Sequence, residues 1–142
     1  MITADHSART IDSMKGRYHI PFLIYAPGIV TPRVDSEVGS QVDVIPSLLQ
    51  LLGLESAHHA MGNSLFDKAA ERFALLNFSQ GYGWLNGNVL LEIGPAGDVV
   101  NLRDIHSGED IQRDPGPYLE AGLSYLETGR RLLIENRFAP VP

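Results

Sequence analysis

Residues 40–53 read SQVDVIPSLLQLLG and predict an amphipathic helix, the best-defined element of this chain. Ser40 with Asp43 three residues later resembles a capping box, and Asp43 by itself is an alternative N-cap. Pro46 falls in the first turn, where backbone N–H groups have no helical partner. The broad leucine-rich face predicts packing against a core, and Gly53 suits the C-terminal stop.

Segments with the pattern of β-strands lie on either side of this helix. Residues 20–26 form a short apolar run closed by Pro27 and Gly28, which predicts a buried strand that enters a turn. Residues 73–78 predict another buried strand. Residues 1–4 indicate the end of a further strand, because a polar pair follows them at once.

The second half of the chain predicts an antiparallel meander followed by a helix. Asn86 and Gly87 lie between apolar segments, the strongest short hairpin signal, and predict a type I′ turn with positive φ at both residues. The meander is expected over residues 82–105. A last helix is expected over residues 117–136, where Gly122 lowers the helix propensity.

The order of these elements predicts the α/β class, with a small antiparallel β-meander and a C-terminal helix. Residues 1–70 are expected to contribute part of an α/β core. Residues 71–142 are expected to form the hairpin, meander and terminal helix packed on that core, in one domain overall. A single strand–helix unit cannot make a doubly wound sheet, so the first part is expected to need neighbours.

Composition excludes several classes of function. The chain has 142 residues, 44% of them hydrophobic, which suits one globular domain. Its 17 acidic and 11 basic residues give a net charge of −6 with no basic cluster, which argues against a nucleic-acid partner. The absence of cysteine excludes disulfides and thiolate metal sites. The sequence contains neither the pattern of a signal peptide nor an apolar run of membrane length, so we expect neither element in this chain.

Asp5 and His6 are the residues with the clearest chemical potential. A carboxylate and a neutral imidazole form a mixed donor set suited to Zn²⁺ or Mn²⁺. Adjacent residues of a regular strand point to opposite faces, so both can reach one metal ion, or two neighbouring ions, only if the strand ends there. Most such pairs are solvated loop residues, and the dipeptide alone does not decide between the two interpretations.

Four segments in order resemble one group of families. Residues 3–9 (TADHSAR) resemble the metal-binding motif of the alkaline phosphatase superfamily. Residues 18–28 (YHIPFLIYAPG) resemble the segment that follows in sulfatases and lipoteichoic acid synthases, and residues 40–53 match the helix of those families. Residues 62–65 (GNSL) resemble the Gly-x-Ser-Leu after that helix. The chain therefore resembles the C-terminal part of an alkaline-phosphatase-like α/β sandwich of the sulfatase or lipoteichoic-acid-synthase type.

This resemblance implies a metal-dependent phosphotransferase or hydrolase that acts on phosphate or sulfate esters, with Asp5 and His6 as metal ligands. Mn²⁺ is the expected ion, with Zn²⁺ or Ca²⁺ as alternatives. Arg9 and His19 are candidates for substrate contact. The families' nucleophile lies at the end of an earlier strand, so no catalytic residue is assigned in this chain, and the chain alone is expected to be inactive.

The resemblance also implies partners and a location. They are a phosphate- or sulfate-ester substrate, including a lipid head group, and the remainder of a parent chain at the extracytoplasmic (periplasmic) face of the inner membrane. Asp-His in place of the Asp-Asn of many sulfatases favours the phosphate branch. One alternative is a truncated, non-catalytic accessory module of the same fold, and another is a relative of alkaline phosphatases or phosphopentomutases. Ser7 is interpreted as a structural residue or one that supports the ligands, and not as a nucleophile. His58 and His59 are interpreted as loop residues and not as a metal site.

Overall fold

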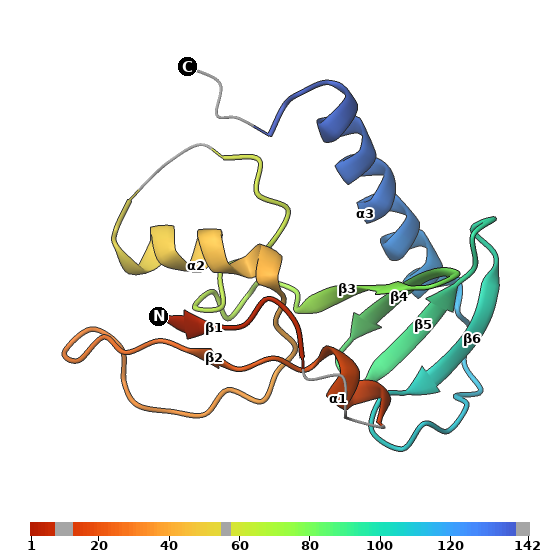
Figure 1. Cartoon of the computed structure of the whole chain (residues 1–142), viewed down its shortest axis with the longest axis horizontal. Helices are drawn as coiled ribbons and strands as arrows, with labels where there is room; N and C mark the ends of the chain where they lie inside the picture. Colours follow the sequence, from red (N-terminus) through yellow and green to blue (C-terminus); the bar gives the residue numbers. More distant parts are fainter. Residues whose placement is uncertain (8–12, 55–57, 139–142) are drawn as a thin grey trace.

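The computed structural model describes residues 1–7, 13–54 and 58–138, and Figure 1 shows their arrangement. The first half contains two short strands and the helices between and after them. They are β1 (Ile2–Thr3), α1 (Met14–Tyr18), β2 (Phe22–Leu23), the 3₁₀ turn η1 (Gln41–Asp43) and α2 (Val44–Leu51). The second half contains a four-stranded sheet and one long helix. They are β3 (Phe73–Phe78), β4 (Gly81–Asn86), β5 (Val89–Ile93), β6 (Val99–Asp104) and α3 (Gly116–Ile134).

The α/β class predicted from the sequence is confirmed. The second half is an antiparallel meander in the order β3-β4-β5-β6, with α3 lying across one face (Figure 1). The predicted strand over residues 73–78 is its first member, paired with β4 from Phe73↔Asn86 to Phe78↔Gly81. The meander thus begins one strand earlier than residues 82–105.

The predicted type I′ turn was wrong in its position by one residue. Asn86 pairs with Val89, so the central residues are Gly87 and Asn88. Only Gly87 has a positive φ, at 58°. A positive φ at the first central residue alone, with glycine there, is the requirement of a type II′ turn, whose twist also suits a hairpin.

The core lies between the meander and α3. Trp84, Leu91 and Ile93 are buried in the sheet, and Phe73 stacks on Trp84 with ring centroids 4.6 Å apart. Gly122 was expected only to weaken α3, yet it is buried against this sheet. A Cβ at Gly122 would lie 2.9 Å from Ile93 Cδ1, so the missing side chain allows the helix to approach closely.

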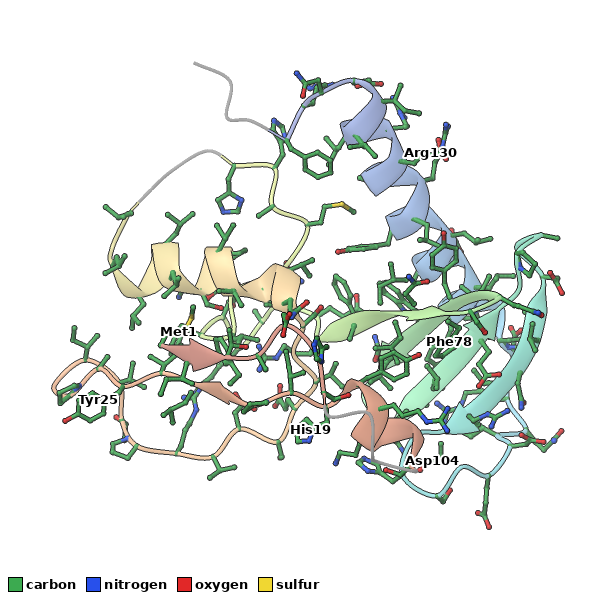
Figure 2. All side chains as sticks on the ribbon, in the orientation of Figure 1. Met1, His19, Tyr25, Phe78, Asp104 and Arg130 are labelled. Atoms are coloured by element: carbon green, nitrogen blue, oxygen red, sulfur yellow. The ribbon has the colours of Figure 1, made fainter. Side chains whose placement is uncertain are left out.

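The first half is much less buried. The predicted buried strand over residues 20–26 was wrong in length and burial, because β2 contains only Phe22 and Leu23 and pairs antiparallel with β1 alone. Leu23 is 55% exposed and Tyr25 is 81% exposed. Figure 2 shows Tyr25 at the outer tip of this half. A fully apolar strand is buried only where both of its faces are covered, and the described residues do not cover both.

Helix α1 connects the two halves. Ser13 caps it, since its side chain accepts a hydrogen bond from the Gly16 N–H. The Tyr18 hydroxyl donates to the Asn77 carbonyl at 3.0 Å, and its ring packs edge-on against Phe78 with centroids 5.6 Å apart. Burial raises the pKa of Tyr18, because a partly buried site disfavours the charged phenolate.

A buried polar network joins the start of α2 to residues 62–65. The Asp43 carboxylate accepts the Ser40 N–H through Oδ2 and the Asn63 N–H through Oδ1, both at 2.8 Å. The Ser47 hydroxyl donates to the Asp43 carbonyl and accepts the Leu65 N–H at 2.9 Å. The expected capping role of Asp43 is thus only part of what its carboxylate does.

Gly62 is required by the same network. A Cβ at this position would collide with the Val42 carbonyl and lie 2.6 Å from the Asp43 nitrogen. Both obstacles are backbone atoms, which cannot rotate away as a side chain would. The backbone of residue 62 can therefore approach η1 only without a side chain.

We expect Gly62→Ala to lower the free energy of unfolding by about 1–3 kcal/mol, the usual cost of overpacking. Gly116→Ala is the matched control, because its new Cβ meets only the flexible Asp114 carboxylate, at 3.1 Å. Chemical unfolding of both variants measures the difference. Equal stability of the two variants would contradict the tight approach at Gly62.

Candidate functional site

Asp5 and His6 lie in the turn that follows β1. The strand ends at Thr3, so the alternation that would send the two side chains to opposite faces no longer applies. The Asp5 Oδ1 accepts the His6 N–H at 3.0 Å and lies 3.8 Å from His6 Nε2. The two side chains therefore face one another in a local turn.

The His6 ring has one nitrogen engaged and one available. Its Nδ1 lies 2.9 Å from the Ser7 carbonyl, an acceptor that requires Nδ1 to carry the proton. The lone pair of Nε2 is then available on the side of Asp5. A second-sphere carbonyl bond of this kind is the usual way in which a metal-binding histidine is oriented.

This donor set fits a divalent metal as two ligands of a larger site. The carboxylate oxygen of Asp5 and Nε2 of His6, 3.8 Å apart, could both serve as ligands of one divalent ion. The two side chains are 90% and 77% exposed, so the site is open. Within residues 1–7, 13–54 and 58–138, no group of three or more His, Asp or Glu side chains is placed to hold an ion. Further ligands are needed for a complete coordination sphere.

The backbone of this turn is held from two directions. The Gln41 side-chain amide donates to the Ala4 carbonyl at 3.1 Å and to the Asp5 carbonyl at 3.0 Å. On the other side, the Ser7 hydroxyl donates to the Arg17 carbonyl. The turn is thus attached to η1 and to α1, even though its side chains are solvated.

The two candidates for substrate contact have different positions. Arg9 lies outside the described residues. His19 caps the C-terminus of α1 and is exposed just before β2 (Figure 2). Because β1 and β2 are antiparallel, with Thr3 opposite Phe22, His19 lies at the same end of the ladder as the Asp5 turn.

His58 and His59 are not part of this site. Both line a separate cavity of about 550 Å³ beside α3, together with the aromatic residues Phe73, Trp84 and Tyr125. His58 Nδ1 accepts the Ala60 N–H at 3.3 Å, a local turn contact.

Gln41 is the residue that the sequence did not single out. It occupies an unremarkable position between the expected cap residues Ser40 and Asp43. Its two bonds span 37 and 36 residues of sequence, and no local pattern encodes contacts of that range. The only signal in the sequence was that the two motifs, residues 3–9 with the Asp-His pair and residues 40–53 with Gln41, resemble segments of the same families.

Comparisons with known proteins agree on this architecture. Residues 1–54 match the family model described as sulfatase, and this range includes both the Asp5 turn and α2. A crystal structure of a protein in the alkaline phosphatase superfamily from Vibrio parahaemolyticus superposes with a TM-score of 0.79 at 23% identity. The match covers 98% of this chain and 36% of that one. The described residues contain no helix with the length and apolarity that a membrane crossing requires.

We expect opposite tautomers at two exposed histidines. His6 should carry its proton on Nδ1, which donates to the Ser7 carbonyl, whereas His58 should carry it on Nε2, because its Nδ1 accepts the Ala60 N–H. Long-range ¹H–¹⁵N NMR spectra of the neutral imidazoles, recorded at alkaline pH, distinguish the two forms. The Nε2-protonated form at His6 would contradict the geometry described for the site.

Proposed function

The chain is sulfatase-like over its first 54 residues and has an alkaline-phosphatase-like fold, and from this premise we propose that Asp5 and His6 are metal ligands. The site they belong to transfers or hydrolyses phosphate or sulfate esters. The observation that carries the proposal is the turn after β1, in which Asp5 Oδ1 and the available His6 Nε2 lie 3.8 Å apart. This pair lies inside the matched segment.

The proposed ion is Mn²⁺, which the resemblance to lipoteichoic acid synthases implies, with Zn²⁺ or Ca²⁺ as alternatives. Asp5 supplies a negative oxygen, which all three ions accept, and His6 supplies a neutral nitrogen, which favours Mn²⁺ and Zn²⁺. When bound, such an ion polarises the transferring group and lowers the pKa of an attacking hydroxyl. The residues of this chain hold and orient that ion.

The proposal requires further ligands and a nucleophile from additional chain. The apolar surface of the first half supports this requirement. Ile2, Leu23 and Ile45 are each more than half exposed, at 63%, 55% and 60%. The meander, in contrast, has a buried core cluster that includes Trp84, Leu91 and Ile93. Covering such surface is favourable by roughly 25 cal/mol per Å². We infer that the remainder of an α/β core covers β1, β2 and α2.

Substrate contact follows from the same geometry. His19 is exposed at the end of the β1–β2 ladder where Asp5 and His6 lie, and it can approach an ester bound at the metal. Arg9 follows the Asp-His pair by three residues, and a guanidinium suits an anionic ester. The likeness to lipoteichoic acid synthases extends the proposal to a lipid head group at an extracytoplasmic membrane face.

A non-catalytic accessory module is the second candidate. The observation that favours it is the count of two ligands in the described residues, fewer than a tightly held ion needs. Such a module would keep the fold and the apolar contact surface without binding metal. Metal binding therefore separates the two candidates.

We expect Mn²⁺ added to isotope-labelled chain to broaden the NMR signals of Asp5, His6 and Ser7 before all others. Paramagnetic broadening detects even the weak binding that two ligands allow. Asp5→Asn and His6→Gln should each abolish this selective broadening, because each removes one ligand. His106→Gln is the matched control, since His106 is an exposed histidine near a carboxylate, that of Asp104, which accepts the backbone N–H of His106.

Broadening that persists in both ligand variants would contradict the metal-ligand role of the pair. A wild-type chain with no selective broadening, at unchanged fold, would favour the accessory module.

A further inference from the structure

Two hydrogen bonds from the Gln41 side chain join η1 to the Asp5 turn. Among the hydrogen bonds of the described residues, no other residue of η1 reaches this turn. The Gln41 Nε2 lies 3.1 Å from the Ala4 carbonyl oxygen and 3.0 Å from the Asp5 carbonyl oxygen. A carboxamide NH₂ group has two hydrogens, so both carbonyls can be satisfied at once. A single side chain therefore holds two consecutive peptide groups.

These two peptide groups determine the conformation of Asp5. The Ala4 carbonyl belongs to the peptide plane before the Asp5 Cα, and the Asp5 carbonyl belongs to the plane after it. Peptide planes are rigid, so the backbone at a residue has only the two dihedrals between its flanking planes. Restraining both planes restrains φ and ψ of Asp5, and with them the direction of its Cα–Cβ bond and the path of the backbone into His6.

Gln41 is itself held in place by the buried network. It lies between Ser40 and Asp43, whose N–H and carboxylate are bonded at 2.8 Å. The Asp43 carboxylate also binds the Asn63 N–H, and the bare backbone at Gly62 packs against Val42 and Asp43. The position of the carboxamide is thus set by α2 and residues 62–65, not by the solvated turn.

We propose that Gln41 is a positioning residue for the metal ligands: it transfers the rigidity of the Asp43 network to the exposed Asp5–His6 turn. This inference rests on the proposed function, because Gln41 can position metal ligands only if Asp5 and His6 bind metal. The Gln41 carboxamide donates to the backbone carbonyls of Ala4 and Asp5 and to no side chain of the turn. Its effect passes through the backbone of Asp5.

The test uses Gln41→Met, which keeps the length and neutral charge of the side chain and removes both donors. Gln50→Met is the matched control, because Gln50 is an exposed glutamine in the second half of α2. Two measurements are made on the labelled chain. The first is the carbonyl ¹³C chemical shift of Ala4 and Asp5 without metal, and the second is the Mn²⁺ concentration that half-broadens the Asp5 and His6 signals.

We expect Gln41→Met to move both carbonyl shifts and to raise the half-broadening concentration on the order of ten-fold, the usual effect of losing an outer-sphere partner. Gln50→Met should change neither. Circular dichroism and thermal unfolding like those of the control establish that the variant remains folded.

Carbonyl shifts that match those of the control would overturn the inference, and so would moved shifts with an unchanged Mn²⁺ titration. In either case selective broadening of the wild-type signals leaves the proposed function standing. If the wild-type chain shows no broadening that depends on Asp5 and His6, the proposed function fails and the positioning role falls with it. If the carbonyl shifts of Ala4 and Asp5 still move in Gln41→Met, the hydrogen bonds of Gln41 have a structural role only.

Discussion

The buried carboxylate of Asp43 is the interaction on which the first half of this chain depends. The residue is 3% exposed, and its two oxygens each accept a backbone N–H, from Ser40 and from Asn63. A buried carboxylate without partners is costly, whereas charge-assisted bonds to backbone N–H groups are strong and short. The chain after α2 must therefore return to η1, and it can approach closely enough because residue 62 is glycine.

The candidate site gains its order from this buried network and not from its own packing. Asp5 and His6 are solvated, and a turn with exposed side chains has little apolar contact to hold it. Gln41 from η1 and Ser7, bonded to Arg17, attach its backbone to two helical segments. Metal ligands on a rigid backbone lose less conformational entropy on binding than ligands on a mobile one.

The two halves differ in how completely they are covered. The meander and α3 close a core around Trp84, Leu91 and Ile93, with the three aromatic rings of Phe73, Trp84 and Tyr125 in contact. Burial against Phe73 and Trp84 also raises the pKa of the Tyr125 hydroxyl, because this environment disfavours the charged phenolate. The β1–β2 ladder has no comparable second layer in the described residues. Such a distribution suits a chain whose first half completes its sheet with further strands.

The sequence by itself determined the α/β class, a helix within residues 40–53, the meander and the Asp-His pair at the end of a strand, because each depends on local periodicity or on a short motif. It misplaced the hairpin turn by one residue, since Asn86 and Gly87 satisfy a turn signal in two registers that only strand pairing separates. It overestimated the burial of residues 20–26, because burial depends on neighbours that no local pattern supplies. Only the tertiary structure decided that the buried Asp43 carboxylate binds the N–H groups of both Ser40 and Asn63. The same holds for the requirement that residue 62 lacks a side chain and for the bonds from Gln41 to Ala4 and Asp5. Those facts depend on contacts between segments that are distant in sequence, and their geometry exists only once the chain has folded.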